Sequence, residues 1–212
     1  MKKLLLLPFF ASLLGAENVT VKITKDIPYV YTTDSGKKVK VERIQDVNNR
    51  LTDDYTKTSR PCPPFCVQPT KIDPEIKNIE ELELLNFMQH EVKDGTGVII
   101  DARLKSWYEL ESIPSAINLP FPIMLHATKS KAEQIFKLLG MTIDKDGTWN
   151  FSKAKTLAVY CNGVWCGQTH HFMTGILKYH YPKSKLRYYR SGFQGWKLLG
   201  LTTIVHKEIK KK

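Results

Sequence analysis

The stretch LAVYCNGVWCGQTHHFMTGILK, residues 157–178, decides the fold of this 212-residue chain. Its first four residues are a continuous apolar run, which is typical of a strand buried on both faces of a parallel sheet. A loop containing two glycines follows at 161–167, and helical spacing of apolar residues continues over 168–178. We therefore predict a strand, a tight loop and a helix, with the loop at the strand end where active groups of open α/β sheets lie.

The same alternation extends on both sides of this stretch. Further buried strands are predicted at 98–100 and 186–189. Helices are predicted at 79–88 with Asn78 as the cap, at 132–139 ended by Gly140, and at 196–199 ended by Gly200. The expected architecture is α/β, with a central parallel sheet flanked by helices over residues 76–206.

A smaller β-rich extension precedes this domain at residues 17–75. Polar and apolar residues alternate at 19–23 and 38–41, and the turn signal Asp34-Ser35-Gly36 lies between them, so we expect a hairpin. The extension then becomes polar and irregular, and its segment 59–66 is Ser-Arg-Pro-Cys-Pro-Pro-Phe-Cys. Three prolines in four positions exclude regular helix there.

The first sixteen residues carry a secretory signal pattern. Lys2 and Lys3 precede an apolar run over 4–14, and the small residues Gly15 and Ala16 close it. The run is too short to span a bilayer, which needs about 20 residues. We expect cleavage after Ala16 and export to a bacterial periplasm, with an uncleaved anchor as the alternative because Leu14 is large for its position.

Composition excludes several classes of protein. A hydrophobic share of 42% with 25% charged residues is that of a globular chain, so disorder, collagen and coiled coil are excluded. Four cysteines are too few for a disulfide-built scaffold. The net charge of +11 comes from dispersed lysines and a basic tail at 207–212, so we expect neither a nucleic-acid partner nor stable membrane insertion after cleavage.

Cys161 opens the loop and is the candidate nucleophile. Backbone N–H groups of a tight loop and the positive end of the following helix converge there, and they stabilise a thiolate or an anionic persulfide. Asn162 and Gly163 suit the backbone angles that such a loop requires. The competing interpretation is a buried structural cysteine.

Four segments resemble the rhodanese-like sulfurtransferase family. They are Ile99-Ile100-Asp101-Ala102-Arg103, the run Ile113-Pro114-Ser115-Ala116-Ile117-Asn118-Leu119-Pro120, the loop from Tyr160 to Gly167, and Gly192-Phe193-Gln194-Gly195-Trp196 with Gly200-Leu201. Together they cover about residues 73–205. The resemblance implies a three-layer rhodanese-like fold.

The resemblance also implies a reaction. Cys161 would accept sulfane sulfur from a small donor or a persulfidated protein, form a persulfide, and pass the sulfur to a thiol or to cyanide. The backbone N–H groups of Asn162, Gly163, Val164, Trp165, Cys166 and Gly167 would hold the persulfide, and no metal or organic cofactor is implied. Many members carry arginine late in the loop, where this chain has Trp165 and Cys166, so the donor is left open. Related phosphatases on this fold have a longer loop ending in arginine, which this chain lacks.

The remaining cysteines leave alternatives open. Cys166 is either a buried structural thiol or a resolving thiol that attacks a persulfide or sulfenic acid on Cys161, which would make a thiol–disulfide or redox-sensing protein. Cys62 and Cys66 fit a small disulfide, free thiols or half a zinc site. A non-enzymatic sulfur-carrier or binding module is the third class of function.

Asp101 and Arg103 are interpreted as structural residues near the site. We expect an internal ion pair and hydrogen bonding between them, with no part in the chemistry. The sequence indicates no oligomeric state.

Overall fold

The computed structural model describes residues 19–206, and a five-stranded parallel sheet forms its centre. The strand order is β3 (Lys77–Ile79), β10 (Leu186–Tyr189), β9 (Thr156–Tyr160), β4 (Gly97–Asp101) and β6 (Ala116–Asn118). All four pairings are parallel. The predicted α/β fold with a central parallel sheet is confirmed, while the expected signal at 1–16 and the basic tail at 207–212 lie outside the described residues.

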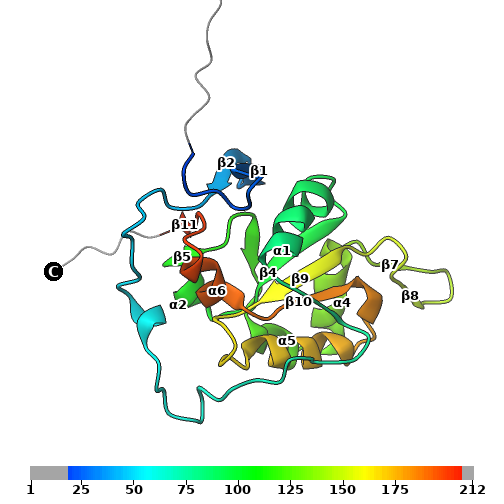
Figure 1. Ribbon diagram of the computed structural model, residues 1–212. Coiled ribbons are helices and arrows are strands. Elements are labelled where there is room, and N and C mark those ends of the chain that lie inside the picture. The colour runs from blue at the N-terminus through cyan, green and yellow to red at the C-terminus, as the bar shows by residue number, and fades with distance from the viewer. Residues whose placement is uncertain (1–18, 207–212) are drawn as a thin grey trace, which may run out of the picture.

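Helices cover both faces of the sheet, which gives three layers (Figure 1). One face packs against α3 (Phe121–Leu125), α4 (Lys129–Leu138) and α5 (Gln168–Leu177). The other packs against α1 (Glu81–Phe87), which continues as a π-helical turn over Met88–Val92, and α6 (Gly192–Leu198).

Strand β9 is apolar from Leu157 to Tyr160, and both of its faces are buried there. Successive side chains of a strand point to opposite faces of the sheet. Leu157 and Val159 accordingly join the core under α5, and Ala158 and Tyr160 join the core under α1 and α6. Cys161, the residue after Tyr160, therefore lies at the carboxyl end of a strand that has a hydrophobic core on each side.

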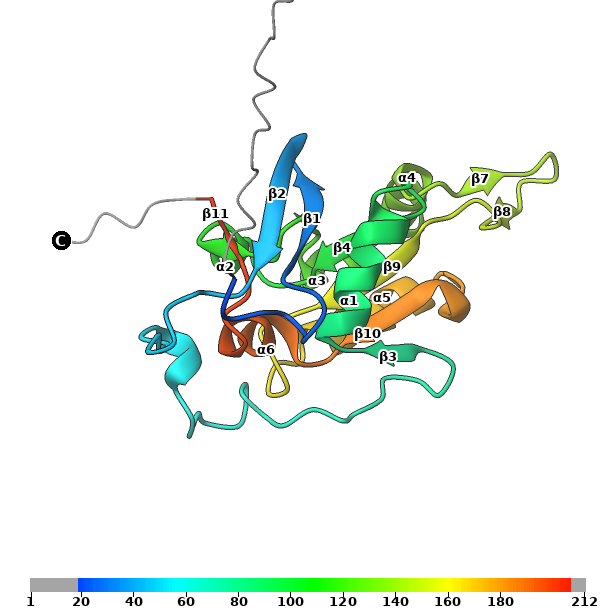
Figure 2. The ribbon, with the colours of Figure 1, turned by 45° about the horizontal axis from the view of Figure 1, so that its top comes forward.

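Smaller elements decorate the domain. They are α2 (Lys105–Tyr108), the 3-10 turn η3 (Lys183–Lys185), the pair β5 (Glu111–Ser112) with β11 (Ile204–Val205), and the pair β7 (Thr142–Ile143) with β8 (Trp149–Asn150). The β7–β8 hairpin projects from the body of the molecule (Figure 2). Within residues 19–206, no helix has both the length and the apolar character needed to cross a membrane.

The N-terminal hairpin is present with one predicted strand misplaced. Strand β1 (Tyr29–Asp34) pairs antiparallel with β2 (Lys37–Glu42), and residues 19–23 form no strand. The turn signal was correct: Ser35 and Gly36 both have positive φ, as a two-residue hairpin turn requires, so the residues next to the turn pair with each other. The alternating polar and apolar residues at 19–23 lie farther from the turn, and residues 29–34 pair with β2 in their place.

The helix predicted at 132–139 begins three residues earlier, at Lys129, with Thr128 as its N-cap. Two further predicted helix starts are also wrong. Asn78 does not cap the first helix, because it lies in β3 and pairs with Tyr188; Glu80 is the N-cap and forms a capping box with Glu83. The last helix begins at Gly192, four residues earlier than predicted. In both cases pairing and packing between distant segments decide the boundary.

Residues 53–70, here called the strap, connect the hairpin to β3 along the outside of the domain (Figure 1). The strap contains one 3-10 turn, η1 (Asp54–Thr56), and otherwise no regular structure. Its path returns the Pro-rich segment to the sheet end where the loop at 161–167 lies.

Candidate active site

Cys161 lies directly after β9, and Gly167 is the N-cap of α5, so the loop at 161–167 fills the gap between strand and helix. Cys161 and Cys166 are both free thiols and are 2% and 5% exposed. The N–H of Cys166 donates to the carbonyl of Gly163 at 2.9 Å, which closes the loop on itself. That N–H is thereby unavailable to Cys161, contrary to the predicted set of six donors.

The loop is fixed to the start of α6. The N–H groups of Phe193 and Gln194 donate to the carbonyls of Cys161 and Asn162, both at 2.9 Å. Gly192, before them, has a φ of +58°, and a Cβ there would lie 2.5 Å from the Cys161 carbonyl oxygen. Only glycine allows this close approach, which explains the glycine that precedes Phe193 in the sequence.

The sulfur of Cys161 faces one hydrogen-bond acceptor and several donors. As a thiol, Cys161 donates to the carbonyl oxygen of Cys166 at 3.0 Å. Burial raises the pKa of Cys161, but hydrogen bonds from the Cys166 thiol, the Thr169 hydroxyl and the N–H groups of Thr169 and Gly163 outweigh it and lower the pKa to about 7. The lowered pKa favours the thiolate, which is the form in which a sulfur nucleophile reacts.

Cys166 stays protonated beside it. Donation to Cys161, together with burial, raises the pKa of Cys166 well above its usual range. Its sulfur in turn accepts from the side-chain amide of Asn162 at 3.7 Å. Cys166 thus acts as a hydrogen-bond donor to the candidate nucleophile.

A buried ion pair lies beneath the loop. Asp101 and Arg103 are both fully buried, and the Arg103 guanidinium donates to the Asp101 carboxylate through Nε and through Nη2 at 2.6 Å. Tyr160 donates to the same carboxylate at 2.7 Å. Burial lowers the pKa of Arg103, but the charge of Asp101, the hydrogen bond to it, and the neighbouring Tyr160 and Tyr55 together raise it by more, so Arg103 stays charged. Within residues 19–206, neither Asp101 nor Arg103 is hydrogen-bonded to the sulfur of Cys161.

Tyr55 of the strap connects this ion pair to the loop. Arg103 Nη1 donates to the Tyr55 hydroxyl at 3.0 Å, and that hydroxyl donates to Asn162 Oδ1 at 2.8 Å. Gln194 donates to the backbone carbonyl of Tyr55 at 2.7 Å and accepts from the indole N–H of Trp165 at 2.7 Å. The strap is therefore part of the site's wall.

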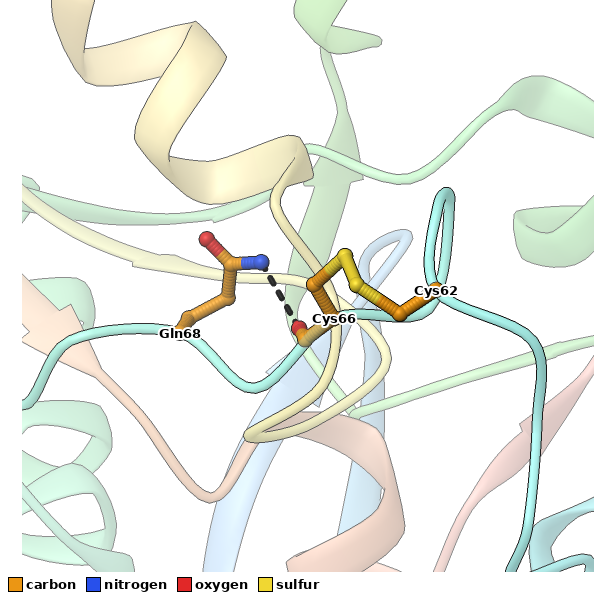
Figure 3. Close-up of a disulfide and its surroundings, with 3 residues drawn as sticks. All are labelled: Cys62, Cys66 and Gln68. Carbon is orange, nitrogen blue, oxygen red and sulfur yellow. Dashed lines mark hydrogen bonds between the residues drawn. A yellow bond between two sulfur atoms is a disulfide. The ribbon is translucent and has the colours of Figure 1, made fainter.

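Cys62 and Cys66 form a disulfide on the strap, close to the loop (Figure 3). Between them lies Phe65, whose ring meets the ring of Trp165 edge-on with 5.5 Å between centroids. The guanidinium of Arg60 lies 4.6 Å from the centroid of Trp165. Trp165 of the loop thus contacts both Phe65 and Arg60 of the strap.

Polar groups gather beneath the first turn of α5. The hydroxyl of Tyr188 and both ring nitrogens of His170 are buried and have no hydrogen-bond partner among residues 19–206. His170 meets the Tyr188 ring edge-on at 5.4 Å. Burial lowers the pKa of His170, and His171 and Arg190 lower it further, so this imidazole is neutral at pH 7.

A cavity of about 730 Å³ adjoins the strap on the side of α2. No residue of the loop at 161–167 lines it. Its lining residues are Asp53, Asp54, Tyr55, Ser106, Trp107, Leu110, Glu111, Phe193 and Val205. The cavity is therefore a neighbour of the site and does not open onto the Cys161 sulfur.

The sequence missed three residues that complete the site. Thr169 could have been found from its place in the first turn after the loop. Gln68 donates its N–H to the carbonyl of Val164 at 2.8 Å. Tyr55 and Gln68 have no local signal, because their contacts depend on where the strap returns. Among residues 19–206, no three His, Cys, Asp or Glu side chains lie close enough together to hold a metal ion.

A strand of a parallel sheet, a closed loop led by cysteine, and a helix define a class of α/β domains. The model of the rhodanese-like domain matches residues 83–199, more than half of the chain, and the chain therefore belongs to the rhodanese-like family. No curated protein sequence matches the chain.

Solved structures with this fold are distant in sequence. A thiosulfate sulfurtransferase from Pseudomonas aeruginosa is 18% identical, with a TM-score of 0.44, over 62% of this chain and 21% of that one. An As-Sb reductase from Leishmania major is 18% identical, with a TM-score of 0.40, over 59% of this chain and 79% of that one. SseA from Escherichia coli, from work on 3-mercaptopyruvate sulfotransferases, is 19% identical, with a TM-score of 0.38. The match covers 57% of this chain and 43% of that one. The chain thus spans about a fifth of the length of the first of these proteins.

Proposed function

We propose that this rhodanese-like protein is a sulfurtransferase that moves sulfane sulfur through a persulfide on Cys161. The observation that carries the proposal is the position of Cys161 directly after β9, where its buried sulfur lies beside the N–H groups of Gly163 and Thr169, which lower its pKa. A thiolate at this place attacks the sulfane sulfur of a donor, and the donor's remaining fragment leaves with the bonding electron pair. The acceptor thiolate or cyanide then attacks the outer sulfur, and the Cys161 thiolate leaves.

The residues around Cys161 have separate parts in this cycle. The N–H groups of Gly163 and Thr169 and the hydroxyl of Thr169 lower the pKa of the Cys161 thiol, and the same donors would hold the negative charge of the persulfide. The Cys166 thiol donates to the thiolate. Asp101 and Arg103 stabilise the end of the sheet beneath the loop and touch no reacting atom.

The donor class follows from what lines the loop. No arginine lies in residues 161–167, where a bidentate contact to thiosulfate would be made. The proposal therefore favours a persulfidated protein or a low-molecular-weight persulfide as the donor, with a thiol as the acceptor.

Sulfur transfer from three donors tests the proposal: thiosulfate, glutathione persulfide and a persulfidated carrier protein. We expect turnover with at least one, complete loss in Cys161→Ser, and partial activity in Cys166→Ser. If Cys166→Ser were as inactive as Cys161→Ser, the protein would be a dithiol redox protein instead. No turnover with any donor, together with stable binding of a partner, would make it a sulfur-carrier module.

The proposal also places the protein in a bacterial periplasm. The signal pattern at 1–16 and the Cys62–Cys66 disulfide support export, since disulfides persist in oxidising compartments. N-terminal sequencing of the protein from a periplasmic fraction should begin at Glu17. A sequence beginning at Met1 in the membrane fraction would show an uncleaved anchor.

A further inference from the structure

The strap brings a second pair of cysteines to the loop that holds Cys161. The N–H of Gln68 donates to the carbonyl of Val164 at 2.8 Å, and the Phe65 ring lies against the Trp165 ring. These two contacts lie on either side of Cys66 in the sequence. Cys66 is therefore held beside the loop by direct contacts on both sides.

A short series of contacts leads from Cys66 to Cys161. The side-chain amide of Gln68 donates to the carbonyl of Cys66 at 2.8 Å, and the same amide lies against Gly167, 3.5 Å from where a Cβ would stand. The residue before Gly167 is Cys166, whose carbonyl accepts from the Cys161 thiol at 3.0 Å. Gln68 is the one side chain in this series between the strap and the loop, and a persulfide would extend Cys161 by one further sulfur.

The two strap cysteines differ in exposure. Cys62 is exposed, and Cys66 is half-buried next to the loop (Figure 3). An external thiol can therefore reach the disulfide from the Cys62 side. Cys66 is the member that lies between the two contacts of the strap with the loop.

We propose that Cys62 and Cys66, when reduced, accept the sulfane sulfur from Cys161 and release it as hydrogen sulfide. This inference rests on the proposed persulfide at Cys161. It adds an activity to the transfer reaction, because the acceptor belongs to the same chain and the product is sulfide.

The chemistry has two steps and balances. The Cys66 thiolate attacks the outer sulfur of the Cys161 persulfide; the bond between that sulfur and Cys161 Sγ breaks, and Cys161 leaves as a thiolate. The Cys62 thiolate then attacks Cys66 Sγ; the bond from Cys66 to the outer sulfur breaks, hydrosulfide leaves, and the Cys62–Cys66 disulfide forms. Two electrons from the strap dithiol reduce one sulfane sulfur to sulfide. A thiol reductant, such as glutathione or a protein dithiol, returns the disulfide to the dithiol.

A single-turnover experiment on the full chain tests this activity. Protein reduced with dithiothreitol and freed of it is treated with one equivalent of glutathione persulfide, and sulfide and the mass of each cysteine peptide are measured over time. We expect sulfur first on the Cys161 peptide, then about one equivalent of sulfide together with the Cys62–Cys66 disulfide. In Cys62→Ser the second step is blocked, so the extra sulfur should remain on the Cys66 peptide.

Matched variants separate this activity from others. Val67→Ser changes an exposed strap residue between Cys66 and Gln68 and should release sulfide at the wild-type rate. The double variant Cys62→Ser/Cys66→Ser should keep the sulfur on Cys161 and release no sulfide.

Two results would overturn the inference while leaving the proposed function intact. One is a Cys161 persulfide that stays in place in the reduced wild type. The other is sulfide release by the double variant at the wild-type rate, which would assign the reductant role to Cys166. Absence of sulfur on Cys161 in every variant would remove the proposed function and this inference together.

Discussion

Cys161 and Cys166 are buried and unbonded in the loop, whereas Cys62 and Cys66 are joined in a disulfide on the strap, with Cys62 in solvent. The loop pair is surrounded by hydrogen-bond donors that separate the pKa values of its two thiols. The strap pair is reachable from outside and lies beside the loop without entering it. The difference indicates that neighbouring groups, more than the spacing of two cysteines, decide which sulfur is a nucleophile and which pair is oxidised.

The largest expected effect comes from removing the nucleophile itself. Cys161→Ser should lower persulfide formation and sulfur transfer by about 10³-fold or more, as loss of a covalent nucleophile does. The strap variant Cys62→Ser/Cys66→Ser should form the Cys161 persulfide at the wild-type rate. A comparable loss of persulfide in the strap variant would end the distinction between the two pairs.

The second effect concerns the support beneath the loop. Arg103→Met leaves the buried Asp101 carboxylate without its ion-pair partner, so the free energy of unfolding should fall by about 3–5 kcal/mol. On the strap, Lys57→Met removes an exposed contact to Asp54 and should cause no measurable change. Urea titration of both variants is the measurement. Equal stability losses would mean that strap and loop are held in the same way.

Reduction of the strap disulfide should have a smaller effect on stability. Cys62 and Cys66 close a ring of five residues, and the entropy of so small a ring is worth about 2 kcal/mol. Urea titration with and without a phosphine reductant, using Cys161→Ser so that only the strap pair reacts, measures it. A loss much above this value would show that the disulfide is a structural clip on which the domain depends.

The smallest effect is a pH dependence that differs between the pairs. Below a pKa of about 7 the rate of Cys161 alkylation should fall about tenfold per pH unit, and above it the rate should level off. The sign follows from the lowered pKa: the reactive thiolate is present above pH 7 and is lost as the pH falls. After reduction, the strap cysteines are alkylated in the same samples and give the comparison.

Thr169→Val sharpens that comparison. It removes a hydroxyl that lowers the pKa of Cys161, so the alkylation midpoint of Cys161 should move upward while the strap midpoint stays unchanged. Peptide-resolved alkylation over pH 5–10 gives both midpoints in one experiment. An unshifted Cys161 midpoint would show that the hydroxyl does not reach the thiolate.

The sequence predicted the centre of the fold well because its signals are local. The apolar run before Cys161, the glycines of the loop and the helix after it all act within residues 157–178, and the structure has β9, the loop and α5 there. The turn at Ser35 and Gly36 was equally local, although the strand assigned to 19–23 was wrong. Where a signal lies within a few residues, the backbone follows it.

The strap could not be predicted because its role is set by contacts across the chain. The Tyr55 hydroxyl donates to Asn162, which is 107 residues away in the sequence, and nothing in the sequence around Tyr55 indicates this hydrogen bond. The same holds for Gln68 at Val164, and for the helix start at Gly192, which the close approach to the Cys161 carbonyl fixes. The candidate nucleophile Cys161 could thus be predicted from the sequence, while the strap residues that pack against its loop could not.

The most direct test of the account is the location of the first sulfur. The full chain, treated briefly with glutathione persulfide, is digested at acidic pH, and the cysteine peptides are resolved by mass spectrometry at the earliest times. The account predicts one added sulfur on the Cys161 peptide before any other cysteine gains mass, and none on that peptide in Cys161→Ser. Sulfur appearing first on Cys62, Cys66 or Cys166 would contradict it.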